Sequence, residues 1–526
     1  MVRHTVAATI LLAACVLGLA SAGEPIPFEL PKDAKPVMKQ GRHIGWGLGL
    51  DTNPLVILKP EPQGSEAARA IGPLAVDAEF KRRDVPDAAA WEKVRAELKK
   101  RMAAYFGTMP PRDLPLDPKV EKEEDREDHT LQVVSIAFDK ERRGRIGLLV
   151  PKGLGGHSAL RTPHSANPCI LLNDRWGGGI ALASKGVYSR AIAAHFVREG
   201  FVVAVIEHWD EQFGTSSDLC TAGAASHNVM RAVDYLATLK GLVDPQRIGY
   251  WGHVYGADLI PFIASHEDRL ACFVASCTCH NIVGHYSGAF WSPPFWARQG
   301  DNMGIASRTN PAMYYSRRSV ATNPLPFLTQ EMMAFVAPRP FLVINANSPD
   351  LFEAVRPVWK LYGKGPLLEL ISHKWGTNQP VNARDHTVDF LLRTLCGIYP
   401  GKAPEATAKA ILDALRSNDA GVSIPAARLA GWWRLKEATE PLLGFLDHKD
   451  VALRRAAAKA LHRIGAMKEI IPHLKHPDPV VRLAAVEMMQ VFGTEEAFRI
   501  LAKDREDDDR WVNEAKWQTL QVNPWE

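Results

Sequence analysis

The segment of this chain with the clearest chemical pattern is Gly252-His253-Val254-Tyr255-Gly256. Two glycines around three residues, after an apolar run and before a helical pattern, are typical of a tight strand-to-helix turn that exposes its central side chain as a nucleophile. A nucleophile needs a lone pair and a proton that a neighbouring base can remove. Val254 stands at the central position and carries only an isopropyl group. The sequence therefore predicts the turn without the attacking group.

Two other routes to hydrolysis remain open in the sequence. Ser276, Cys277 and Cys279 follow an apolar run and offer a different nucleophile, although none is expected on a sharp turn and a buried strand-end thiol is normally inert. A zinc ion with an open coordination position would instead activate a water molecule. The side chains at expected strand ends that suit such an ion are His208, His253, His280 and His373, with Asp174, Glu207, Asp210 and Asp350. No HExxH-like pair fixes their spacing, so the sequence predicts no resident metal and no other cofactor.

Apolar runs alternate with helical patterns through the middle of the chain, and this alternation is expected to position those groups. The runs cover residues 169 to 174, 201 to 208, 247 to 253, 270 to 277, 341 to 347 and 367 to 373. Runs of this length separated by helices indicate a sheet that is mostly parallel and buried on both faces. The expected fold class is therefore α/β with a doubly wound sheet, in which ligands bind beyond the carboxyl ends of the strands.

Three further segments flank or interrupt this alternation. Apolar residues recur every three or four positions from 89 to 107, which predicts a helix. Residues 131 to 138 and 145 to 151 predict an antiparallel strand pair around a polar turn. An insertion from 280 to 319 is rich in aromatic residues, which suit a lid that stacks on sugar rings or simply packs on the body.

The chain becomes entirely helical in character from about Pro404. Asp450 and Asp478 begin two copies of one unit, and Arg454 and Arg482 correspond to each other at the same spacing. Arg510 follows Arg482 at that spacing again, in a weaker third copy. Such units stack to bury a common face that no single unit can bury. The tail resembles HEAT or PBS-lyase-type repeats, and it is expected either to dock a protein partner or to pack as an appendage that stabilises the main domain.

Composition and the start of the chain set broader limits. The 526 residues include 63 Lys and Arg against 59 Asp and Glu, an excess too small to indicate a nucleic-acid partner. Residues 1 to 22 have the layout of a cleavable signal peptide, which predicts a secreted or periplasmic protein, and a lipoprotein anchored through Cys15 is the alternative. No later run is long enough to span a membrane. The expected domains are the signal peptide at 1 to 22, an extension at 23 to 118, the α/β domain at 119 to 400 and repeats at 404 to 526.

Several motifs together resemble secreted bacterial carbohydrate esterases of the acetyl-xylan-esterase and glucuronoyl-esterase type, within the α/β-hydrolase superfamily. They are WEKVRAELKKRM, LVPKG, CILLND with its glycine-rich turn, DPQRIGYWGHVYGA and APRPFLVIN. The resemblance implies that Val254 replaces the nucleophile, that His373 is the base, and that Asp350 stands near the place of the acid. It also implies oxyanion or ligand binding by the backbone of Trp176, Gly177, Gly178 and Tyr255.

The sequence thus favours a carbohydrate-esterase-like protein that has lost its nucleophile and keeps a binding cleft for an ester-bearing carbohydrate or another small acyl ligand. A triad acts as a unit, so the loss of its nucleophile removes most of its rate enhancement. The alternative is an active carboxylic-ester hydrolase that uses a non-serine nucleophile or a metal-activated water.

Overall fold

A computed structural model describes most of the chain from residue 85 onward. The described ranges are 56–57, 75–76, 82–83, 85–106, 109–126, 129–140, 142–152, 166–173, 179–180, 192–207, 221–253, 255–277, 333–345, 349–372, 381–401, 403–417, 419–446, 448–492 and 495–521. The signal-peptide, Cys15 and aromatic-insertion predictions therefore lie outside the described residues.

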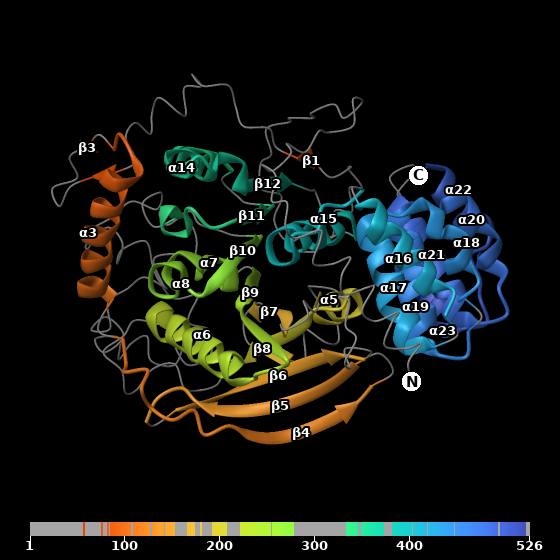
Figure 1. The fold of residues 1–526 in the computed structure, drawn as a ribbon, viewed down its shortest axis with the longest axis horizontal. Helices are drawn as coiled ribbons and strands as arrows, with labels where there is room; N and C mark the ends of the chain where they lie inside the picture. The colour runs from red at the N-terminus through yellow and green to blue at the C-terminus, as the bar shows by residue number, and fades with distance from the viewer. Residues whose placement is uncertain are drawn as a thin grey trace.

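A ten-stranded sheet forms the centre of the molecule, in the order β1-β12-β11-β10-β9-β7-β8-β6-β5-β4 (Figure 1). Its strands are β1 (Val56–Ile57), β4 (Lys119–Asp125), β5 (His129–Ala137), β6 (Arg143–Pro151), β7 (Asn167–Asn173), β8 (Val202–Glu207), β9 (Val243–His253), β10 (Leu270–Ser276), β11 (Phe341–Ile344) and β12 (Leu368–Ser372). The six strands β8, β7, β9, β10, β11 and β12 pair in parallel, while β1, β4, β5 and β6 pair antiparallel with their neighbours. The predicted fold class, a mostly parallel α/β sheet, is confirmed. A separate two-stranded sheet pairs β2 (Ala75–Val76) with β3 (Arg82–Arg83).

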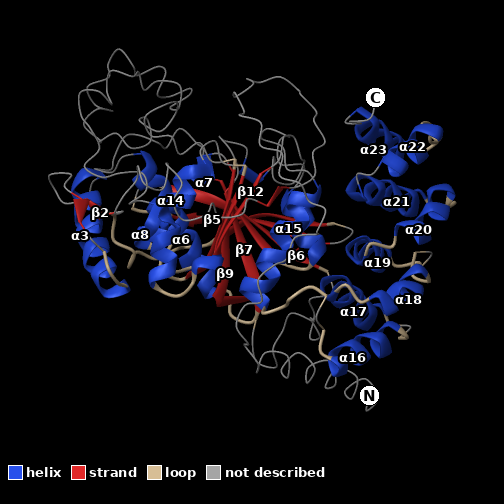
Figure 2. Cartoon of the chain, turned by 90° about the horizontal axis from the view of Figure 1, so that it is seen from above, coloured by secondary structure: helices blue, strands red, loops and turns tan. Residues whose placement is uncertain are grey.

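Helices cover both faces of this sheet, as Figure 2 shows. One face carries α3 (Ala88–Phe106), α6 (Thr221–Thr238), α8 (Ile260–His266) and α14 (Pro349–Leu361). The other carries α5 (Ile192–Glu199) and α15 (Val381–Leu391), which continues as a π-helical turn, Leu392–Cys396. Alternate residues of each central strand face opposite cores, as Leu171 and Leu172 of β7 do. Both faces of the central strands are thus mostly apolar, which explains the hydrophobic runs in the sequence.

Helical repeats pack outside α5 and α15. They comprise α16 (Glu405–Leu415), α17 (Ala420–Trp433), α18 (Thr439–Leu443), α19 (Val451–Ile464), α20 (Met467–Ile470), α21 (Pro479–Phe492), α22 (Glu495–Lys503) and α23 (Arg510–Gln521), with short 3₁₀ turns between some of them. The core that covers the α5 face of the sheet runs without a break into this tail. Leu453 and Ala457 of α19 and Val481 and Ala485 of α21 are buried in it.

The two predicted repeat units have the same caps. The Asp450 carboxylate accepts hydrogen bonds from two backbone amides of the first turn of α19, and Asp478 accepts one at the start of α21. Arg454 donates to the carbonyl oxygen of His448, and Arg482 donates to that of His476. The two arginines that correspond in the sequence therefore make corresponding bonds to the backbone.

The third unit follows a different register from the one that Arg510 indicates. Asp509 caps α23, so Arg510 is the first residue of its helix. Arg454 and Arg482, by contrast, each stand a full helical turn beyond the aspartate that caps their helix. Helix α23 also differs in surface, because Trp511 and Trp517 are 65% and 59% exposed. The regular spacing in the sequence therefore does not extend to a structural equivalence at Arg510.

Candidate functional site

The turn between β9 and the short helix α7 (Tyr255–Asp258) is built around its two glycines. A Cβ atom on Gly252 would lie 2.3 Å from the carbonyl oxygen of Gly256, and one on Gly256 would lie 2.1 Å from the carbonyl oxygen of Asn173. Both distances are far below van der Waals contact, so only glycine fits at either position. Strand β9 ends at His253 and α7 begins at Tyr255. The chain therefore makes the tight strand-to-helix turn that the glycine spacing predicts.

A buried tyrosine braces this turn. The Asn173 side-chain amide, at the end of β7, donates to the Tyr250 hydroxyl at 2.8 Å. That hydroxyl donates in turn to the carbonyl oxygen of Gly256 at 2.9 Å. Burial raises the pKa of Tyr250 above its ordinary value, so the phenol stays protonated and keeps both bonds. The ends of two neighbouring strands and the first turn of α7 are thus tied together by one side chain.

His253, the last residue of β9, is also held in place by contacts with its neighbours. Its Nδ1 lies 2.9 Å from Ser276 Oγ, in a hydrogen bond that joins the ends of β9 and β10. Its ring stacks on that of Trp251, with centroids 5.6 Å apart and an interplanar angle of 10°. His253 and Ser276 are both fully buried. These contacts give His253 a scaffolding role beside the turn.

Two residues at neighbouring strand ends have left-handed backbone conformations. Cys277 follows β10 with φ 54°, and Asn345 follows β11 with φ 53°. Their amides donate to Ile344 and Ile371 of the next strands, which continues the ladder beyond the strand ends. Cys277 thus has a left-handed backbone, but nothing in its described surroundings makes the thiol accessible. Its side chain is buried, which fits the prediction of a strand-end thiol.

The structure describes the scaffold of the predicted site more fully than its chemical groups. Tyr255 and Asp350 lie in the first turns of α7 and α14, and their side chains fall outside the described part. Val254, His373, Trp176, Gly177 and Gly178 also fall outside it, so their roles stay predictions. The described strands that precede them in the sequence end at one edge of the sheet. Val254 directly follows β9, His373 directly follows β12, and the segment with Trp176 begins shortly after β7 ends.

The glycine-rich segment after β7 ends in a described residue that also requires glycine. Gly179 has φ 40°, and a Cβ atom there would lie 2.5 Å from Glu207 Oε1. Sequence patterns indicated no role for Asn173 or Tyr250, and they offered Ser276 as an alternative nucleophile rather than as the partner of His253. Asn173 and Ser276 end apolar runs, which is a signal, but their pairing depends on strand order.

The strand-end zinc hypothesis gains no support from the described residues. Of the eight ligands that it named, only His253 and Glu207 have described side chains, and the former bonds to Ser276. Within the described ranges, one group of three potential ligands is close enough to hold a metal ion, and it consists of His195, Glu199 and Asp385. Glu199 ends α5, just before β8 begins, and so lies toward the opposite edge of the sheet from Val254.

Comparisons with known proteins agree with this architecture. Residues 189–346 match the model of the prolyl oligopeptidase family, and residues 408–475 match that of HEAT repeats. The chain thus combines a segment similar to that hydrolase family with a helical segment similar to HEAT repeats. The hydrolase domain has the sheet order and the strand-to-helix turn of that fold. No curated protein matches the sequence.

Among solved structures, the hydrolase domain is similar to carbohydrate esterases. A glucuronoyl esterase from Solibacter usitatus is 16% identical, with a TM-score of 0.43, over 60% of this chain and 95% of that one. A family 15 glucuronoyl esterase from Teredinibacter turnerae is 14% identical, with a TM-score of 0.42, over 65% of this chain and 93% of that one. No helix in the described ranges is long and apolar enough to cross a membrane.

Proposed function

We propose that this protein is an exported, carbohydrate-esterase-like α/β-hydrolase that binds an ester-bearing carbohydrate or a related acyl ligand and has lost serine catalysis. The observation that carries the proposal is Val254, which stands between two glycines of a tight turn. The backbone packs so closely at both glycines that a side chain of even one methyl group would clash. The glycines that the turn requires are present, while the residue at its centre has an apolar side chain.

The neighbouring structure supports a retained cleft. The carboxyl edge keeps its Asn173–Tyr250–Gly256 brace and the His253–Ser276 bond, neither of which involves position 254. The amide of Tyr255 follows the lost nucleophile and is the donor that would face a developing oxyanion or a bound carbonyl. The backbone of Trp176, Gly177 and Gly178 is proposed as the second contribution, and His373 and Asp350 as remnants of the base and acid. Export rests on the signal-like residues 1 to 22.

Restoring the hydroxyl tests this proposal most directly. Val254→Ser should hydrolyse 4-nitrophenyl acetate, because the turn would aim the new hydroxyl at the base. Val254→Ala is the matched control, since it changes the same position without adding a nucleophile. We expect Val254→Ser to exceed Val254→Ala by about 10²-fold, the usual contribution of a positioned general base. The additional change His373→Ala should remove that gain.

Continued inactivity of a folded Val254→Ser variant would contradict the proposal that base and cleft survive. Ester hydrolysis by the wild-type protein would also contradict the proposal. The inhibitors of that activity would then show whether a thiol or a metal-activated water is responsible. Cys277 supplies the specific observation for that second function, because it lies on a left-handed turn at the end of the strand next to β9. Turnover that disappears in Cys277→Ala would support a thiol nucleophile, whereas turnover that a chelator abolishes would support a metal-activated water.

A further inference from the structure

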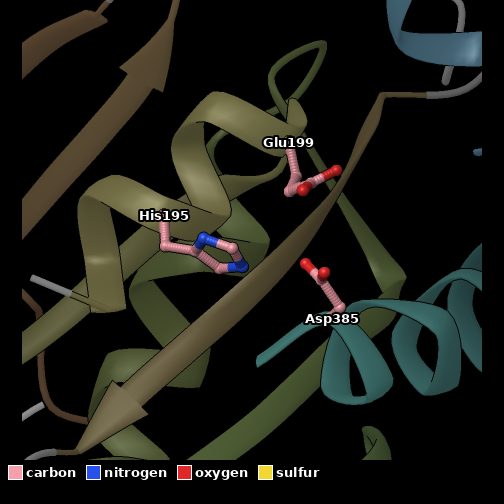
Figure 3. A group of neighbouring side chains, drawn as sticks. All are labelled: His195, Glu199 and Asp385. Atoms are coloured by element: carbon pink, nitrogen blue, oxygen red, sulfur yellow. The ribbon is translucent and has the colours of Figure 1, made fainter. Parts of the chain in front are cut away.

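A buried polar cluster lies where the hydrolase domain meets the repeats, away from the proposed cleft. His195 and Glu199 stand one helical turn apart on α5, and Asp385 points toward them from α15 (Figure 3). One ligand atom of each lies within 4.8 Å of the others. One imidazole nitrogen and two carboxylate oxygens form a donor set that zinc and similar divalent cations accept.

The imidazole of His195 is directed into this cluster without a hydrogen bond at Nε2. Its side chain is nine-tenths buried, with 9% of the residue exposed. An imidazole nitrogen directed at two carboxylates is a common ligand of divalent metal ions.

A lysine from the repeats occupies the space between the carboxylates. Lys459 Nζ, on α19, lies 3.2 Å from Glu199 Oε1 and 3.2 Å from Asp385 Oδ1. The other oxygen of Glu199 accepts a hydrogen bond from Trp432 Nε1 at 3.2 Å, and the other oxygen of Asp385 bonds to His462. A metal ion bound to both carboxylates would lie about 2.0–2.2 Å from each oxygen, which is the region that the ammonium fills.

Lys459 is the cation that the two carboxylates of the cluster share. Glu199 and Asp385 face Lys459, while the nearby Asp389 is paired with Arg463 and with Arg434, the latter at 2.6 Å. Arg384 adds a further positive charge near His195. A divalent ion added beside the ammonium would be repelled by these cations in a site with little exposure to water. With the ammonium removed, Glu199 and Asp385 would lose the cation that they share.

We propose that the Lys459 ammonium is the built-in cation of a three-ligand site whose other members, His195, Glu199 and Asp385, form a binding site for a zinc-class divalent ion once the ammonium is absent. In the native protein the lysine thereby joins α5, α15 and α19, and with them the two domains, without a metal. This inference does not depend on the proposed function, because it concerns a different part of the fold.

The test compares two variants of the full-length protein in thermal unfolding with and without ZnCl₂. Lys459→Ala removes the charge and leaves room for an ion, whereas Lys459→Met removes the charge and fills the space. We expect both to melt below the wild type, and we expect micromolar ZnCl₂ to raise the midpoint of Lys459→Ala alone by several degrees, reversibly with EDTA. The double variant His195→Ala/Lys459→Ala should not respond, which separates this site from zinc bound elsewhere.

Three outcomes would overturn the proposal. One is a folded Lys459→Ala variant that zinc does not stabilise. Another is a zinc response of the wild type that His195→Ala abolishes, because the native site would then hold a metal in spite of the lysine. The third outcome applies if Lys459→Ala is insoluble. The variant Lys459→Cys then serves as a second test, because its thiolate supplies a further ligand. If ZnCl₂ in the growth medium restores soluble expression of neither variant, the proposed metal site is wrong.

Discussion

The turn after β9 and the junction with the repeats are both buried and polar, but they are held together in different ways. At the turn, neutral groups form hydrogen bonds between neighbouring strands, and two glycines allow backbone segments to pack closely. At the junction, charged side chains from three helices depend on one another. Loss of a nucleophile from the first region leaves its scaffold whole, whereas loss of one charge from the second leaves another buried and unpaired. This difference fits the proposal that position 254 lost a catalytic side chain while the fold persisted.

Removal of the repeats should have the largest effect. Truncation after Gly401 would expose the core that α5 and α15 share with the tail and would leave Glu199, Asp385 and Asp389 without their cations. We expect loss of soluble expression, or a melting midpoint many degrees below that of the full chain. Thermal unfolding of both proteins checks this. An unchanged midpoint would show that the junction does not couple the domains, and would favour an independent docking module.

A single neutralised charge at the junction should have the next largest effect. Asp385→Asn breaks a buried ionic set and should lower the free energy of unfolding by about 3–5 kcal/mol at neutral pH. Asp413→Asn is the matched control, because that carboxylate pairs with Arg416 in water and should matter by less than about 1 kcal/mol. Urea unfolding measures both. Equal effects would remove the distinction between the junction and an ordinary surface pair.

The same substitution should change the dependence of stability on pH. Burial alone would raise the pKa of Asp385, but His462 and Lys459 hold that pKa well below its ordinary value. A carboxyl with a lowered folded-state pKa contributes stability above its unfolded pKa and loses it as the pH falls toward the folded value. The gap between wild type and Asp385→Asn should therefore be constant above about pH 5 and should narrow below about pH 4. A gap that instead grows on acidification would contradict this assignment.

A methyl group at the turn should cost less than a charge at the junction. Gly256→Ala would force the backbone at Asn173 to move and should destabilise the protein by about 1–3 kcal/mol. Gly444→Ala provides the comparison, because its Cβ would find ordinary contacts at 3.5 Å or more. Urea unfolding of the two variants checks the difference. If both behave alike, the close fit of the turn is not a constraint on this chain.

Loss of the tyrosine hydroxyl should have the smallest effect on stability. Tyr250→Phe removes both bonds of the brace and should lower the free energy of unfolding by about 1–2 kcal/mol. In the Val254→Ser background it should also lower the turnover number, since the brace fixes the first turn after the nucleophile. Measurement of KM alongside kcat tests this, and an unchanged kcat would assign the tyrosine to stability alone.

Local patterns in the sequence predicted the features that depend on nearby residues. Apolar runs located the central strands, and the glycine pair located the turn between β9 and α7. Strand β4 was missed because all of its residues except Val120 are charged. The Tyr250 brace and the His253–Ser276 bond were missed because they depend on which strands become neighbours.

At the junction, the spacing of polar residues in the sequence does not predict which helices contact one another. His195 with Glu199, Asp385 with Asp389 and Lys459 with Arg463 are each one helical turn apart, so each pair occupies one face of its helix. That spacing marks one polar stripe on each of the three helices. Only the packing of α5, α15 and α19 shows that the stripes face one another, because the three helices lie far apart along the chain.

The charges of β4 have a consequence for how copies of the protein meet. This strand ends the ten-stranded sheet, and its outer row of amides and carbonyls would accept another strand if nothing opposed it. Every residue from Lys119 to Asp125 except Val120 is charged, and most of their side chains are exposed. A second strand approaching this border would have to strip water from several ions at once. Strand β4 therefore disfavours pairing with the edge of another sheet, which opposes aggregation at high protein concentration.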